Sequence, residues 1–143
     1  MAKKKAKAKG REMLSREGQV TGWRTEVMAY PFEVGSTRRE RRAIPSISVL
    51  GAFVEPVKGV TQFDITFTPG APHIGNAEIP CVGVILKAKP AIEGHVTLAP
   101  IEFQTLLALV TTNNLRYLAC DFQEPKYGHA LMSSILFGSE NPA

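Results

Sequence analysis

The sequence predicts a mainly β domain, an antiparallel β-barrel or β-sandwich of about seven or eight strands with one amphipathic helix packed on it. Three observations support this prediction. Apolar and polar residues alternate along several segments, as they do on strands with one buried face. One segment instead spaces its apolar residues as a helix does. Strands and helices do not alternate along the chain, which argues against a doubly wound parallel sheet.

Length and composition are those of one ordinary globular domain. The chain has 143 residues, of which 44% are hydrophobic and 21% are charged. A chain of this length buries enough surface for a real core. These values exclude a fibrous chain, a wholly disordered chain and a disulfide-rich miniprotein. We expect one β-rich domain over residues 18–140 and a basic flexible arm over residues 1–17.

The clearest strand pattern places Phe63, Ile65 and Phe67 on one face, with polar residues between them. Pro31 is expected to divide the first strand, because proline lacks a donor for the ladder. Two segments are expected to be loops, the polar residues 35–42 and the Pro/Gly-rich residues 69–80. The predicted strands are 19–34, 44–54, 60–68, 81–89, 94–99, 115–124 and 129–138, the last two joined by a turn at 125–128.

Four further strands have a predicted apolar face. The expected faces are Ile47, Val49, Gly51 and Phe53 in one strand, Val82, Val84 and Leu86 in the next, and Leu131, Ile135 and Phe137 in the last. Leu118, Cys120 and Phe122 form the same pattern in the strand before the last turn. These residues are the predicted core of the sheet.

One helix is predicted over residues 101–111. Pro100 suits the first helical position, and Glu102 lies in the first turn, where the helix dipole favours an acid. Asn113 can adopt the left-handed conformation that ends a helix. The residues expected to pack on the sheet are Phe103, Leu106, Leu107 and Val110, which have the spacing of one helical face.

Charge is concentrated at the N-terminus. The first eleven residues contain six basic side chains and no acid, namely Lys3, Lys4, Lys5, Lys7, Lys9 and Arg11. The other residues have 11 basic and 13 acidic side chains. Residues 11–17 are expected to form at most a helical turn or two. The arm is a candidate for salt-sensitive contacts with nucleic acid or another acidic partner, and a solubilising tail is the alternative interpretation.

A second basic cluster lies within the domain. Arg38, Arg39, Arg41 and Arg42 surround one glutamate, and such guanidiniums bind phosphates or carboxylates through paired hydrogen bonds. His73, in the Pro/Gly-rich segment 69–80, is a further candidate ligand-binding residue. A solvated surface loop is the simpler interpretation of the arginines.

Arg38-x-x-x-Arg42 resembles the first motif of PilZ domains, which are β-barrels that bind cyclic di-GMP. The segment Ser46-Ile47-Ser48-Val49-Leu50-Gly51 is similar to their second motif, with serine in place of the acid or amide. Only three residues separate the two motifs here, whereas PilZ domains place a strand or more between them. The resemblance covers about fourteen residues and implies a cyclic dinucleotide site at Arg38 and Arg42.

No catalytic or cofactor motif is found in the sequence. His73, His95 and His129 are far apart, and neither Cys81 nor Cys120 has metal-ligand spacing, so no metal or cofactor is expected. Both cysteines are expected to be buried and reduced. No segment is apolar for long enough to span a membrane, and we expect a cytoplasmic protein.

The sequence favours a domain that acts by binding or assembly rather than catalysis, as a homo-oligomer or part of a larger assembly. Two alternatives stay open. One is a cyclic dinucleotide-binding barrel that uses Arg38 and Arg42, and the other is an enzyme with a site built from loop residues such as His73.

Overall fold

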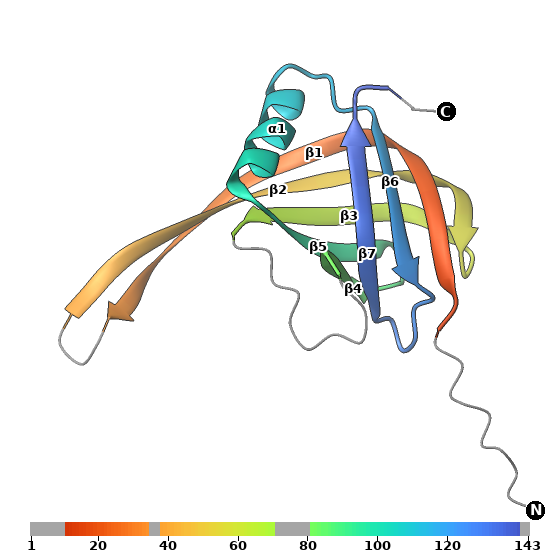
Figure 1. Ribbon diagram of the computed structural model, residues 1–143, viewed down its shortest axis with the longest axis horizontal. Helices are drawn as coiled ribbons and strands as arrows, with labels where there is room; N and C mark the ends of the chain where they lie inside the picture. Colours follow the sequence, from red (N-terminus) through yellow and green to blue (C-terminus); the bar gives the residue numbers. More distant parts are fainter. Residues whose placement is uncertain (1–10, 35–37, 71–80, 141–143) are drawn as a thin grey trace, which may run out of the picture.

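A computed structural model describes residues 11–34, 38–70 and 81–140. These residues form seven strands and one helix, drawn in Figure 1. The elements are β1 (Met13–Val34), β2 (Arg38–Val57), β3 (Val60–Pro69), β4 (Gly83–Lys87), β5 (Ile92–Leu98), α1 (Pro100–Thr111), β6 (Tyr117–Gln123) and β7 (Ala130–Gly138).

The strands close into a barrel in the order β1-β2-β3-β5-β4-β7-β6, which confirms the predicted β-barrel with one helix packed on it. Six of the seven neighbouring pairs are antiparallel, and β3 and β5 are parallel. The parallel pair follows from the path of the chain. β4 lies one place beyond β5, and the chain then returns to insert β5 between β3 and β4. The ring is completed by β6 and β1, where Met13 pairs with Gln123.

Aromatic and branched side chains fill the barrel. Phe53 lies at the centre, with its ring centroid 4.7 Å from that of Phe63 and 6.3 Å from that of Phe122. The alternation predicted for β2, β3 and β6 is confirmed, because the inward residues of these strands are buried. These buried residues include Ile47, Val49, Ile65, Phe67, Leu118 and Cys120.

Helix α1 covers one end of the barrel beside β3 and β5 (Figure 1). It begins at Pro100, as predicted, and the Glu102 carboxylate accepts a 2.8 Å hydrogen bond from the backbone N–H of Ala99. It ends before Asn113, whose φ of 59° is left-handed. Phe103, Leu106 and Val110 are buried.

The prediction for Leu107 is wrong, because its side chain is 39% exposed. The buried face of α1 is narrower than the apolar spacing suggested. Leu106 occupies the position against the barrel, and Leu107 lies one residue further round the helix.

Two expected surface segments belong to strands. β1 begins at Met13, so residues 13–17 pair with β6 instead of forming a helical turn. β2 begins at Arg38, so the part of the expected loop 35–42 that the structure describes is strand. β1 also continues through Pro31, because Pro31 lies where β1 has a neighbour only on the β2 side. These segments are rich in polar residues, and such residues are usual in loops, so the local composition does not indicate that they pair as strands.

The apolar face predicted for β4 is wrong, and the face predicted for β7 is wrong only at Leu131, since Ile135 and Phe137 pack against the core. In β4 the buried residue is Ile85, while Val82 and Leu86 are 39% and 53% exposed. In β7 a register shift against β6 lies between the pairs of Asp121 and Phe122, so Met132 is buried and Leu131 is not. A bulge of this kind reverses the face of every residue before it.

Candidate interaction surface

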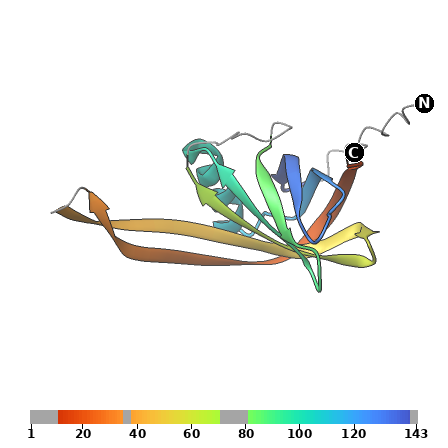
Figure 2. The same ribbon diagram turned by 90° about the horizontal axis from the view of Figure 1, so that it is seen from below.

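The β1–β2 ribbon extends well beyond the barrel. β1 pairs with β6 only over residues 13–19, and β2 pairs with β3 from Ile47 onward. The two strands stay paired with each other as far as Val34 and Arg38. Residues 26–34 and 38–46, here called the projecting hairpin, therefore form a two-stranded ribbon whose described residues pair with no third strand. Figures 1 and 2 show it standing away from the barrel in both views.

One face of the projecting hairpin continues the buried face of the barrel. On β2, Ile47 is buried, and Pro45 and Ala43 follow on the same side. On β1, Val27 lies opposite Pro45 and Ala29 lies opposite Ala43. The apolar alternation thus continues beyond the barrel as far as Ala29 and Ala43, and Arg41 takes the next position on this face of β2.

The other face of the projecting hairpin is also partly apolar. Met28 lies opposite Ile44, and Tyr30 lies opposite Arg42. Val27 is 68% exposed and Met28 is 66% exposed, although they point to opposite faces. A two-stranded hairpin is marginally stable alone in water, and exposed apolar groups on both faces are typical of a surface that a partner covers.

The arginine cluster lies at the far end of this hairpin. Arg41 and Arg42 are exposed, and Arg41 borders a shallow hollow with Pro31 and Tyr30. Arg38 and Arg42 are four residues apart on one strand, roughly 13 Å by strand geometry. The arginines are mixed with acids, since Glu33 pairs in register with Arg39. The cyclic dinucleotide hypothesis for Arg38 and Arg42 stays a prediction.

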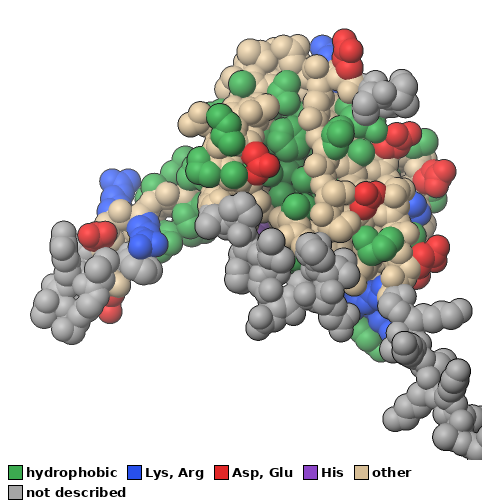
Figure 3. All heavy atoms as spheres, in the orientation of Figure 1, with side chains coloured by type: hydrophobic (Ala, Val, Ile, Leu, Met, Phe, Trp, Pro, Cys, Tyr) green, Lys and Arg blue, Asp and Glu red, His purple; other side chains and the backbone are tan. Residues whose placement is uncertain are grey.

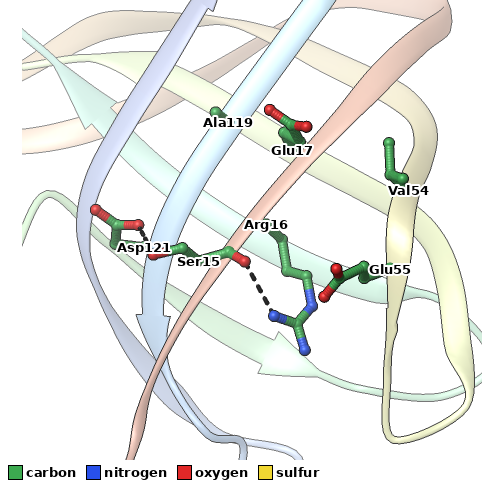
Figure 4. A pocket seen from close by; sticks show the side chains of 7 residues that line it. All are labelled: Ser15, Arg16, Glu17, Val54, Glu55, Ala119 and Asp121. Carbon is green, nitrogen blue, oxygen red and sulfur yellow. Dashed lines mark hydrogen bonds between the residues drawn. The ribbon is translucent and has the colours of Figure 1, made fainter. Parts of the chain in front are cut away.

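The opposite end of the molecule has a groove between β1, the end of β2, and β6. A first hollow, of about 260 Å³, is lined by Ser15, Arg16, Glu17, Val54, Glu55, Ala119 and Asp121 (Figure 4). A second, of about 330 Å³, shares Glu17 and Val54 and is also lined by Gly18, Gln19, Val20, Arg116, Tyr117 and Ser139. We call the two together the acidic groove.

Hydrogen bonds hold most of the charged groups of the acidic groove. The Asp121 carboxylate accepts bonds of 2.6 Å from the Ser15 hydroxyl and 2.8 Å from the Ser134 hydroxyl. The Arg16 guanidinium donates to the carbonyl oxygens of Ser15 and Pro56 at 2.9 to 3.3 Å. Because these groups are fixed by their own strand neighbours, the groove keeps its shape.

Two groove residues are open to a partner. Val54 is 71% exposed, which is unusual for a β-branched side chain on a strand. Glu55 makes no hydrogen bond or ion pair with any described residue. Figure 4 shows its carboxylate on the Arg16 side of the hollow, with Glu17 beyond. With three acids and one arginine, the first hollow has a net negative charge.

Of the other predicted site residues, some lie outside the described residues and one, Arg11, contacts the barrel. His73 and the five lysines Lys3, Lys4, Lys5, Lys7 and Lys9 lie outside the described residues. Arg11 is described, and its guanidinium donates a 2.6 Å hydrogen bond to the carbonyl of His129. One of the six charges assigned to the arm is therefore held against the barrel. In the described ranges, no group of three or more His, Cys, Asp or Glu residues could hold a metal ion.

Sequence reasoning missed both surfaces for identifiable reasons. The sequence predicts a strand over 19–34 that Pro31 divides, and a polar loop over 35–42, so the arginines are not assigned to a strand. Val27, Ala29 and Pro31 alternate on one face of β1, which stays paired with β2 through Pro31 to Val34. The acidic groove is built from three separate segments, so no local pattern could have shown it.

Comparisons with family models, curated protein sequences and solved structures gave no match. Within the described residues, no helix is both long and apolar enough to cross a membrane. The interpretation of this chain therefore depends on its own geometry.

Proposed function

We propose that this protein is an assembly subunit, and that it joins copies of itself through the projecting hairpin. The observation that carries this proposal is the exposure of Val27 and Met28 on opposite faces of a ribbon that pairs with no third strand among the described residues. A ribbon of nine residues per strand is about 30 Å long. A partner that covers it supplies the burial that a free hairpin lacks.

A protein partner fits this surface better than a nucleic acid does. The nine-residue strands of the projecting hairpin contain four arginines and three glutamates, so their charges nearly balance. Surfaces that bind nucleic acid have a strong positive excess. Exposed Val, Met and Ile side chains instead match the apolar centre of a protein–protein interface.

The test is a shortened variant in which an Asn-Gly turn replaces residues 27–45. Glu26 and Ser46 are directly paired, so a two-residue turn can join them and leave the barrel pairing intact. Analytical ultracentrifugation should show concentration-dependent association for the full chain and a monomer for the shortened variant. Thermal unfolding serves as the control, since the barrel of the variant should stay folded.

A full chain that sediments as a monomer at all concentrations would overturn the proposal. Equal association of the full and shortened chains would also overturn it, because the contact would then lie on the barrel.

A further inference from the structure

We infer, on the basis of the proposed function, that the projecting hairpin of one copy docks on the acidic groove of the next copy. The contact is thus head-to-tail, between two different surfaces of the same chain. The hairpin lies at one end of the long axis of the molecule, and the start of β1 and the end of β2, which line the groove with β6, lie toward the other end (Figures 1 and 2). Because the hairpin of one copy meets a different surface of the next copy, the contact is heterologous, unlike a contact in which a patch meets its own copy.

Charge supports the choice of occupant. Arg41 is exposed near the end of the hairpin, and the first hollow of the groove contains Glu17, Glu55 and Asp121 against one arginine. Figure 3 shows arginine side chains on the hairpin, with acidic side chains beside them, and several carboxylates toward the opposite end of the barrel. Complementary charges of this kind orient two surfaces and disfavour the wrong pairing.

Apolar contact supports the same pairing. Val54 is 71% exposed at the junction of the two hollows, and Val27 and Met28 are similarly exposed on the hairpin. An exposed apolar side chain at the centre of a groove, with charges around it, is the usual arrangement of an interface core and rim. Glu55 lies beside Val54 and is available to a guanidinium of the incoming hairpin.

The consequence is an assembly that extends. Each copy that docks its hairpin leaves its own groove free for a further copy. Such heterologous contacts generate a ring when the rotation closes and a filament when it does not.

A complementation experiment tests the head-to-tail pairing. One full-length variant has a defective hairpin, with Val27→Asp and Met28→Asp. A second has a defective groove, with Val54→Asp and Glu55→Arg. For each variant alone, the dissociation constant of self-association should rise by at least about tenfold, because a buried charge opposes docking. Mixed together, they should form a dimer with one intact contact, of twice the monomer mass by light scattering. The control is Ile101→Asp, since Ile101 is 73% exposed on α1 and belongs to neither the hairpin nor the groove lining.

The outcomes separate this inference from the proposed function. Wild-type chains that never associate overturn both. Wild-type chains that associate, with defective variants that do not complement each other, overturn only the head-to-tail pairing and favour hairpin-to-hairpin contact. A charge exchange adds a second measurement, in which Arg41→Glu weakens association and Glu55→Arg in the partner chain restores it. Failure of this rescue, with a normal association of the Ile101→Asp control, would also count against the groove.

Discussion

The phenol of Tyr117 donates a 2.9 Å hydrogen bond to the carboxylate of Glu17, between β6 and β1. Burial raises the pKa of Tyr117, and the hydrogen bond and negative charge of Glu17 raise it further. The bond joins the two strands that close the barrel, at the edge of the acidic groove.

We expect Glu17→Gln to lower the pKa of Tyr117 toward its usual value of 10.0, because the substitution removes the nearby negative charge. The measurement is an absorbance titration of tyrosinate with Tyr30 and Tyr127 changed to phenylalanine, so that Tyr117 titrates alone. An unchanged titration midpoint in Glu17→Gln would mean that burial accounts for the whole shift.

The buried thiol of Cys120 makes stability depend on alkaline pH. Burial, and next the charge of Asp121, raise its pKa from 9.0 to about 12, and Arg16 partly opposes them. A raised pKa in the folded state gives stability that is complete below the unfolded pKa. We therefore expect the free energy of unfolding to fall as pH rises from 9 toward about 12. Urea unfolding across this range should show a flatter profile for Cys120→Val than for the wild type.

Two adjacent leucines of α1 should respond differently to truncation. Leu106 is fully buried and Leu107 is 39% exposed. Leu106→Ala should cost about 2–5 kcal/mol of unfolding free energy, the range for a buried leucine. Leu107→Ala should cost less than about 1 kcal/mol, as surface substitutions do. Chemical denaturation of the two variants provides a matched pair, and equal losses would contradict the placement of α1.

Gly51 allows a close approach inside the barrel. A Cβ at this position would collide with the carbonyl oxygen of Gln19 and the ring of Phe63. Gly51→Ala should therefore destabilise the fold by about 1–3 kcal/mol or more, as overpacking does. Gly22→Ala is the control, because nothing lies within 4 Å of its Cβ position. A melting temperature for Gly51→Ala equal to that of Gly22→Ala would show that β1 and β2 can separate without cost.

The nucleic-acid affinity expected of the basic arm is a separate hypothesis. A variant that lacks residues 1–10 loses five lysines and keeps Arg11, which binds the His129 carbonyl. Its affinity for duplex DNA should be much weaker than that of the full chain. Its slope on a logarithmic plot of affinity against salt should be about 4 units shallower. Equal binding by both chains at moderate salt would remove the hypothesis.

The strand pattern inside the barrel could be predicted from sequence because one buried face imposes a strict alternation. Phe63, Ile65 and Phe67 are buried as expected, and Asn113 ends the helix. The pattern gave the wrong face where a bulge intervenes, as at Ser133, the unpaired residue between Met132 and Ser134, so that Met132 is buried in place of Leu131. A single unpaired residue reverses the alternation and leaves no mark in the composition.

The candidate surfaces were less predictable than the fold. The pairing of Arg38 with Val34 gives a polar segment the conformation of a strand, beyond the part of β2 that pairs with β3. The groove joins Ser15, Val54 and Asp121, which are far apart along the chain. Contacts of such long sequence separation come from barrel closure, which no local property encodes.

Because Met13 pairs with Gln123, β1 of a chain under synthesis cannot complete its pairing until β6 has been made. A ribosome that adds about 5–20 residues each second completes β6 roughly 5–20 seconds after β1. During that interval one edge of β1 has no partner from its own chain, while β2 already pairs with the other edge. An unoccupied strand edge attracts strands of other nascent chains. Synthesis on crowded polysomes is therefore the stage at which this barrel is most exposed to mispairing.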